Sequence, residues 1–327
     1  MQSKCNIMCA FSRCRDAKNL LIFKGMEVRG TKLRDIEWPT VALLAGCYAL
    51  WVAVTVFYGY LGPALLIVLV APLVTLHSSL QHEAAHGHPT RIAALNEALV
   101  SLPLGLLFPY RRFRALHLRH HNDAALTDPY DDPESFYYAV GDWTVLPRLI
   151  QKVLDFNNTF VGRFTVGPLV MAVGFAANEF RLIVNGDRQV FGAWVRHAAG
   201  LVIVIAWTHV VCGIPILVYV AGAYLGLAVL NLRTFAEHQA HEVPGGRTVI
   251  VEASPIFGLL FLNNNLHYVH HENPRVSWYR LPALYRANRE AFLAANESYS
   301  FKGYGEMIRR YLFRPKAPVP HPYLRRG

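Results

Sequence analysis

The sequence predicts an all-α integral membrane protein with about four transmembrane helices in two hairpins and a helical cap on the cytoplasmic side. Three observations support this prediction. The 327-residue chain is 53% hydrophobic, and its apolar residues are concentrated in runs of about 20 residues, the length that crosses a bilayer. Basic residues flank these runs, so the net charge of +10 fits membrane-proximal segments. The sequence has no zinc-finger spacing and no stacking-aromatic motif, and we therefore expect no nucleic-acid partner.

The first expected hairpin comprises residues 40–60 and 61–80. Its turn signal is Gly59-Tyr60-Leu61-Gly62-Pro63, which carries no charge. Each run is long enough to cross about 30 Å of hydrocarbon. We therefore expect a helical hairpin that spans the membrane.

The segment between the two hairpins is too polar for a confident further span. Residues 92–108 are weakly apolar and contain Pro103, so we expect a buried or re-entrant piece. Residues 160–177 are apolar but contain Arg163 and Pro168, so we expect them to lie along the membrane interface.

The second expected hairpin comprises residues 194–212 and 214–230, with Gly213 and Pro215 at the bend and again no charge in the turn. Lys and Arg are concentrated instead in both terminal segments and in the central segment. The positive-inside rule therefore places these three segments in the cytoplasm and predicts a multi-pass protein of the cell membrane.

These features divide the chain into three parts. Residues 1–38 carry eight Lys or Arg against four acidic residues, and we expect a cytoplasmic tail in which residues 1–25 are disordered or an extension ahead of a start at Met26. Residues 39–290 are the expected membrane domain, and residues 291–327 the expected basic C-terminal tail. The five cysteines match neither a disulfide framework nor an iron–sulfur spacing.

Histidine is concentrated in three clusters, all at the predicted cytoplasmic side of the membrane. On a helix, positions i, i+3 and i+4 share one face, so the imidazoles of each cluster are expected to point the same way. A single helix does not need so many imidazoles, whereas a metal site assembled from several helices does. The clusters are His82-Glu83-Ala84-Ala85-His86, His117-Leu118-Arg119-His120-His121 and His267-Tyr268-Val269-His270-His271.

The number of histidines favours two metal ions. A mononuclear zinc site uses three or four protein ligands, and the clusters supply about twice as many. His238 follows the last predicted span and is the candidate ninth ligand, with His241 as the second choice. Imidazole binds iron, zinc, copper and nickel, so the ligand type alone does not identify the metal. The predicted ligands are His82, His86, His117, His120, His121, His238, His267, His270 and His271.

The ordered motifs HEAAH, HLRHH and HYVHH resemble those of the membrane fatty acid desaturase superfamily, which contains integral-membrane di-iron desaturases, hydroxylases and ketolases. The Asp131-Asp132-Pro133-Glu134 segment and the asparagine run at residues 263–265 support the resemblance, which covers roughly residues 38–290. The motifs LRTFAEH and NNNLHYVHHENP are most similar to a bacterial branch that includes dihydrorhizobitoxine desaturase.

The resemblance implies an O2-dependent oxidoreductase that acts on paired donors. Two Fe2+ ions held by the predicted histidines would support the removal of two hydrogens from an unactivated alkyl segment, leaving a C=C bond and water. No catalytic residues are expected beyond the metal ligands. Carboxylates either orient these imidazoles or are ordinary solvated charges. The carboxylates in question are Glu83, Asp132, Glu237 and Glu272.

Electrons must come from another protein. The chain has no Gly-rich dinucleotide loop, no cysteine set for an iron–sulfur centre and no haem-binding module. We therefore expect a separate ferredoxin or cytochrome-type donor with its reductase, which docks on the basic cytoplasmic face. The other expected partners are membrane lipid and the alkyl-bearing substrate.

Alternatives to a fatty acyl desaturase stay open at this point. The same site could desaturate a small metabolite such as dihydrorhizobitoxine, or act as a hydroxylase or ketolase on a lipid. HEAAH also matches the HExxH motif of zinc metalloproteases, but an intramembrane protease would leave six clustered histidines unexplained. A non-enzymatic protein that uses histidine for structure or metal storage does not account for two HxxHH repeats.

The remaining histidines have structural or solvated roles in this interpretation. We expect His77 and His209 to be core histidines, and His88, His197 and His321 to be interfacial or solvated.

Overall fold

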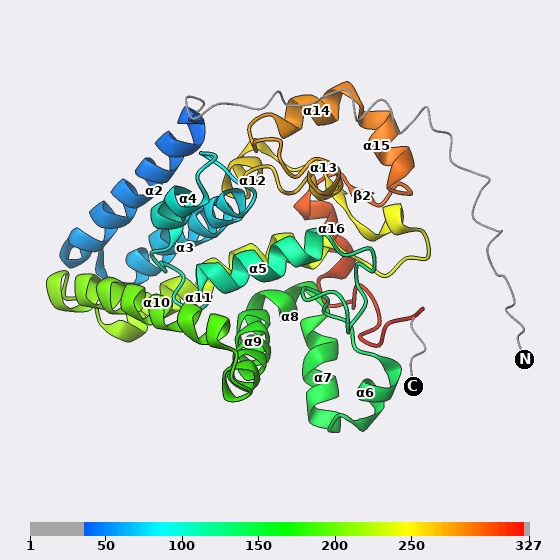
Figure 1. The fold of residues 1–327 in the computed structure, drawn as a ribbon, viewed down its shortest axis with the longest axis horizontal. Coiled ribbons are helices and arrows are strands. Elements are labelled where there is room, and N and C mark those ends of the chain that lie inside the picture. The colour runs from blue at the N-terminus through cyan, green and yellow to red at the C-terminus, as the bar shows by residue number, and fades with distance from the viewer. Residues whose placement is uncertain (1–35, 324–327) are drawn as a thin grey trace, which may run out of the picture. The chain divides into compact units, whose positions relative to one another are not determined.

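The computed structural model describes residues 36–323 (Figure 1). The sequence predicted an N-terminal tail at residues 1–38. Residues 1–35 of this tail, which include the candidate extension at residues 1–25, lie outside the described residues. Most of the described chain is helical, and its only strands are two-residue segments, β1 (Ile250–Val251) and β2 (Ser300–Phe301), which pair in parallel. The predicted all-α class is therefore confirmed for this part of the chain.

Within residues 36–323, five helices are long and apolar enough to cross a membrane, where the sequence predicted about four spans. Four of these helices correspond to the predicted spans. The fifth, α9, overlaps the segment that was expected along the membrane interface, and Figure 1 shows it at a steep angle to α10. The five are α2 (Trp38–Val56), α3 (Tyr58–Ala85), α9 (Gly167–Val184), α10 (Arg188–Ile205) with the π-helix η1 (Ala206–Val211), and α11 (Ile216–Glu237).

Shorter helices make up the rest of the fold, most of them on the side of Figure 1 away from α2 and α10. The central segment contains α4 (Ala93–Val100), α5 (Tyr110–His121), α6 (Val140–Val145), α7 (Arg148–Asn157) and α8 (Phe160–Thr165). The segment after α11 contains the 3-10 helix η2 (Pro244–Arg247), α12 (Pro255–Leu260), α13 (His267–Glu272), α14 (Leu281–Ala287), α15 (Arg289–Ala295) and α16 (Tyr304–Tyr311).

The chain reverses between α2 and α3 close to the predicted turn. Gly62 has φ 71° and ψ 174°, a conformation outside the helical range that glycine adopts at little steric cost. Pro63 follows at once and is compatible with the first turn of the continuous part of α3. The Gly-Pro pair in the sequence thus coincides with the observed break.

The backbones of α3 and α11 lie in close contact. A Cβ atom on Gly226 would lie 2.7 Å from Val74 Cβ and 2.8 Å from the carbonyl oxygen of Ala71. Thr75 Oγ1 also donates a hydrogen bond of 2.8 Å to the Gly226 carbonyl. Small residues at such a crossing allow close helix packing in membrane proteins. This contact is important because α3 and α11 both lead into the histidine clusters.

Two hydrophobic clusters form the core. The first joins α2, α3, η1 and α11 and includes Trp51, Leu66 and Tyr219. The second lies around Phe235 and Phe261 and also contains residues from the C-terminal segment. In that segment, for which the sequence predicted a basic tail, the α16 side chains Tyr304 and Met307 are buried. The chain after residue 290 is therefore packed into the fold as far as residue 323.

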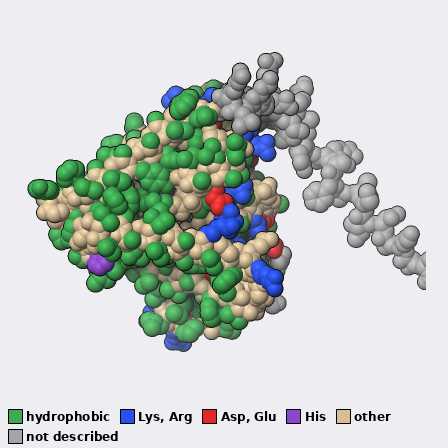
Figure 2. Space-filling view, turned by 60° about the vertical axis from the view of Figure 1, so that its left-hand side comes forward, with side chains coloured by type: hydrophobic (Ala, Val, Ile, Leu, Met, Phe, Trp, Pro, Cys, Tyr) green, Lys and Arg blue, Asp and Glu red, His purple; other side chains and the backbone are tan. Residues whose placement is uncertain are grey.

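The outer face of the long helices is apolar. Figure 2 shows many hydrophobic side chains on the left-hand part of this face, with other side chains, backbone and one histidine between them. Val202, Val210 and Leu217 are each more than 60% exposed, at 67%, 76% and 81%. Contiguous exposed apolar surface of this extent is unusual for a soluble monomer and fits a lipid environment.

Candidate metal centre

Nine histidine side chains converge where four segments of the fold meet. They lie in the last turns of α3 and α5, along the short helix α13, and at the residue that follows α11. These nine are the histidines predicted as ligands from the sequence, and the structure brings all of them together.

The nine histidines form two groups. Within each group every residue offers one ring nitrogen, and these nitrogens all lie within 4.8 Å of one another. The five-histidine group consists of His82, His86, His117, His121 and His270. The four-histidine group consists of His120, His238, His267 and His271. Six of the nine histidines are buried, and His86, His121 and His271 are partly exposed.

The turn before α13 determines where the histidines of α13 lie. Leu262 and Asn263 both have positive φ angles, 50° and 55°, which reverse the chain direction. Asn265 Nδ2 then donates to the carbonyl of Val251 in β1 at 2.7 Å, and the Tyr268 N–H donates to the carbonyl of Val249 at 2.9 Å. The start of α13 is thereby attached to the segment that contains β1, with its histidines facing the other clusters.

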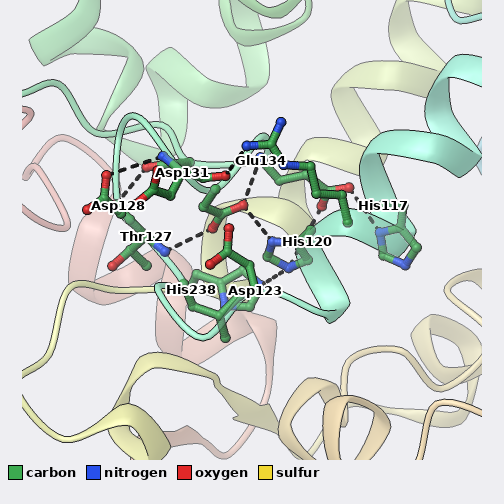
Figure 3. A network of polar contacts seen from close by, with 12 residues as sticks. His117, His120, Asp123, Thr127, Asp128, Asp131, Glu134 and His238 are labelled. Atoms are coloured by element: carbon green, nitrogen blue, oxygen red, sulfur yellow. Dashed lines mark hydrogen bonds and ion pairs between the residues drawn. The ribbon is translucent and has the colours of Figure 1, made fainter.

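An acidic loop after α5 orients two of its histidines. Glu134 Oε1 lies 2.9 Å from His117 Nδ1, and Asp132 Oδ1 lies 2.7 Å from His120 Nδ1. Asp132 also accepts a 2.8 Å hydrogen bond from the Thr127 N–H. Figure 3 shows the loop with Thr127 and Glu134 beside the two imidazoles. Because an ionised carboxylate only accepts, each Nδ1 carries the proton and each Nε2 is left to face its group.

Asn264 lies between the two groups. Its Oδ1 is 3.0 Å from His267 Nδ1, and its Nδ2 is 3.3 Å from His82 Nε2. The amide is 2% exposed. Asn264 thus orients His267 as the carboxylates orient the α5 histidines. The sequence indicated the asparagine run, but it gave no role to this residue.

The donor set of the four-histidine group fits a bound cation. His238 Nε2 lies 3.0 Å from both His120 Nε2 and His267 Nε2. Asp132 and Asn264 accept hydrogen bonds from the Nδ1 atoms of the latter two, so the Nε2 atoms of both rings face His238. One proton cannot bridge both contacts, whereas a metal cation bound by all three nitrogens would satisfy them.

The five-histidine group has the same character. His86 Nε2 lies 3.0 Å from His117 Nε2, and His121 Nε2 lies 3.2 Å from His270 Nε2. Imidazole nitrogens at these separations, from three helices, match the ligand type preferred by iron and other late first-row metals.

Burial keeps most of these imidazoles neutral, which is the form that binds metal. Burial lowers the pKa of His121 to about 3, and the neighbouring His117 and His120 add to this effect. Burial likewise lowers the pKa well below its usual range in His86, His238, His267, His270 and His271.

His120 and Glu134 titrate differently because they face each other. Burial disfavours protonated His120, but Glu134 and Asp132 outweigh it and raise the pKa of His120 to about 9. Burial favours protonated Glu134, but His117 and His120 hold the pKa of this carboxyl well below its usual range. The negatively charged carboxylates of this loop would therefore also attract a cation bound in the four-histidine group.

The other three carboxylates considered in the sequence differ in their contacts. Glu237 forms an ion pair with Arg233, with Nε and Oε1 2.8 Å apart, and lies 3.7 Å from His267 Nδ1. Glu272 is exposed. Glu83 is buried, and its Oε2 accepts a hydrogen bond from the Trp278 N–H at 3.2 Å.

The position of Glu83 argues against a zinc metalloprotease. In the HExxH motif of those enzymes the glutamate acts as general base next to the metal. Here the Glu83 carboxylate accepts from the main chain of the segment that follows α13. The HEAAH histidines, in turn, belong to a group with three further histidines.

The remaining histidines have other partners. The prediction that His88, His197 and His321 are interfacial or solvated is wrong, since all three are buried in the protein. Of the two expected core histidines, His77 is buried, whereas His209 is exposed. His241, the second choice for the ninth ligand, is outside both groups. The observed partners are Tyr48 for His77, Glu37 for His88, the Leu106 carbonyl for His197, the Ile214 carbonyl for His209, the Val243 carbonyl for His241 and Thr127 for His321.

The family model described as fatty acid desaturase matches residues 58–303, which contain both histidine groups. No curated protein matches the chain.

Proposed function

Because the chain belongs to the fatty acid desaturase family, we propose that it is a membrane-bound, O2-dependent desaturase that introduces a C=C bond into a fatty acyl chain. In this proposal the five-histidine and four-histidine groups each hold one iron ion. The observation that carries the proposal is the convergence of nine ring nitrogens into two adjacent groups in a chain of this family. Imidazole sets suit iron, and the family makes iron the first candidate.

The protein's own contribution is to hold and orient the ligands. The two irons, when bound, supply the oxidising chemistry that removes two hydrogens from the alkyl segment with O2. Asp132, Glu134 and Asn264 fix the rings of His120, His117 and His267 through their Nδ1 atoms. Such outer partners maintain ring orientation and ligand basicity. Six of the nine histidines are buried, which limits the access of water to the proposed metal sites.

A small cavity with a volume of about 20 Å³ lies beside α3. It lies between α3, α11 and residues 103–108, and it extends to Gln81, which adjoins His82. Most of its wall is apolar, with His77, Ser78 and Gln81 as the polar groups. The principal apolar lining residues are Val74, Leu106, Phe108 and Leu227. A cavity of this size holds about one water molecule, so the proposal of a fatty acyl substrate rests on the family match.

Metal analysis is the first test of the proposal. Purified protein labelled with iron-57 should contain one iron per histidine group and give the Mössbauer signal of a coupled pair. Zinc in place of iron would contradict the proposed chemistry.

Product analysis tests the reaction. Cells that express the protein and receive isotope-labelled fatty acids should form labelled unsaturated products. His120→Ala should abolish these products while the protein stays in the membrane, and His241→Ala, outside both groups, should not. Hydroxylated products, or desaturation of a small metabolite with no change in fatty acids, would contradict the proposed outcome.

The electron donor and the orientation belong to the same proposal. A separate ferredoxin or cytochrome-type protein would supply electrons at the basic cytoplasmic face, and turnover should then fall with rising salt because exposed charges are screened. A reporter fused after Gly327 should be cytoplasmic. A reporter signal from the opposite side of the membrane would contradict the orientation.

A further inference from the structure

The C-terminal segment contacts the four-histidine group although it lies beyond the family match. The match ends at residue 303. Residues 312–323, which we call the strap, run past α8, the acidic loop and the end of α11. The Val161 N–H donates to the Leu312 carbonyl at 3.1 Å, and the Lys316 N–H donates to the Asn158 carbonyl at 2.9 Å.

The end of α11 requires partners for its carbonyl groups. The last carbonyl groups of a helix receive no hydrogen bond from within the helix, so they need donors from elsewhere. α11 ends at Glu237, and His238 has extended backbone angles, φ −129° and ψ 151°. His238 therefore leaves the helix at the point where its imidazole enters the four-histidine group.

Lys316 supplies those donors. Its Nζ lies 2.5 Å from the Phe235 carbonyl oxygen and 2.6 Å from the His238 carbonyl oxygen. The Nζ atom lies 5.4 Å from the ring centroid of Phe136 and 5.5 Å from that of Phe235. Lys316 thus contacts the backbone at Phe235 and at His238, where the chain leaves α11 and the His238 imidazole enters the four-histidine group.

The far end of the strap is connected to His120. The His321 N–H donates to the Tyr138 carbonyl at 2.8 Å, and His321 Nε2 lies 3.2 Å from Thr127 Oγ1. The Thr127 N–H donates to Asp132, which holds His120 Nδ1. Figure 3 shows Thr127 next to this part of the site, with His120 and His238 side by side.

Both connections lead to the same group. His238 and His120 belong to the four-histidine group, and none of the strap contacts described above involves the five-histidine group. We propose that residues 312–323 position the four-histidine group, with Lys316 as the positioning residue for His238 and His321, through Thr127 and Asp132, as the positioning residue for His120. The inference rests on the proposed function only in requiring that both groups bind metal.

Metal binding to the full-length protein tests the strap. Ferrous iron is titrated anaerobically into metal-free protein in detergent, and affinity and stoichiometry are compared between variants. Lys316→Met should weaken binding of one of the two irons by about 10-fold or more, the range for loss of an outer partner, and leave the other iron unchanged. Lys316→Arg, which keeps the charge and the donors, should restore most of the loss. Lys302→Met, at an exposed lysine of the C-terminal segment, should match the unsubstituted protein.

A second variant covers the case in which Lys316→Met fails to fold. His321→Ala acts at the other end of the strap and should produce the same selective weakening. Equal weakening of both irons, or no change in either variant, would overturn the proposal. Unsubstituted protein that binds fewer than two metal ions would overturn both this proposal and the proposed function. Two bound ions without desaturated product would refute the proposed function alone.

Discussion

Replacing Gly226 with alanine tests the contact between α3 and α11 directly. The new Cβ atom would lie 2.8 Å from the Ala71 carbonyl oxygen and 2.7 Å from Val74 Cβ, whereas ordinary contacts begin at 3.4 Å. Neither neighbour can rotate away, because one is backbone and the other is itself a Cβ atom. The helices must therefore separate by about 0.6 Å, and such overpacking costs about 1–3 kcal/mol.

The separation also affects the metal centre. It would stretch the 2.8 Å hydrogen bond from Thr75 to the Gly226 carbonyl. It would also shift α3, which carries His82, relative to α11, which leads to His238. The better helix propensity of alanine offsets at most about 1 kcal/mol. We therefore expect Gly226→Ala to unfold at lower temperature than the unsubstituted protein and to bind metal more weakly.

Thermal unfolding in detergent, with and without metal, measures both effects. The matched control is Gly192→Ala in α10, where a new Cβ atom would meet nothing within 4 Å. The control should be unchanged or up to about 1 kcal/mol more stable. If Gly226→Ala were as stable as Gly192→Ala, the inferred close packing of α3 and α11 would be refuted.

Three further predictions concern polar groups and the metal. Asp132→Asn keeps the size of the side chain but removes the charge that holds His120 Nδ1, and it should weaken metal binding about 10–100-fold; unchanged affinity would contradict the orienting role. Glu179→Gln leaves Arg112, 14% exposed at its side chain, without its partner and should destabilise the fold by about 3–5 kcal/mol in unfolding assays. Glu97→Gln, in a more exposed pair, is the control and should cost less than about 1 kcal/mol. Removing the metal with a chelator should lower the unfolding temperature, because a ligand that binds only the native state stabilises it; equal unfolding temperatures for the two forms would argue against metal binding.

The helical class and the identity of the clustered histidines followed from the sequence because both depend on local spacing. Apolar runs of membrane-spanning length indicated the long helices, and HxxHH spacing indicated histidines that share a helix face. His238 was preferred to His241 in the sequence, and only His238 lies in a histidine group. The additional apolar helix α9 was assigned to the interface because the segment included Arg163 and Pro168, whereas the observed helix begins at Gly167, after Arg163, and accommodates Pro168 in its first turn.

Contacts between distant segments were not predictable in this way. Lys316 meets the end of α11 from 78 residues away, and no periodicity in a single segment encodes such a meeting. The same applies to Asn264 and His82, which are separated by 182 residues. These contacts arise only when helices pack, so the C-terminal segment looked like a basic tail until its neighbours were known.

The sequence by itself determined which histidines come together, and the tertiary structure decided how they divide. Successive helix residues are about 100° apart around the helix axis. Viewed along the axis, position i+4 therefore lies about 40° to one side of position i, and position i+3 lies about 60° to the other side. His117 and His121 accordingly join the five-histidine group and His120 the other, whereas in α13 the i+3 residue His270 joins the five-histidine group. Which side faces which group depends on how α5 and α13 pack, and packing is a property of the whole fold.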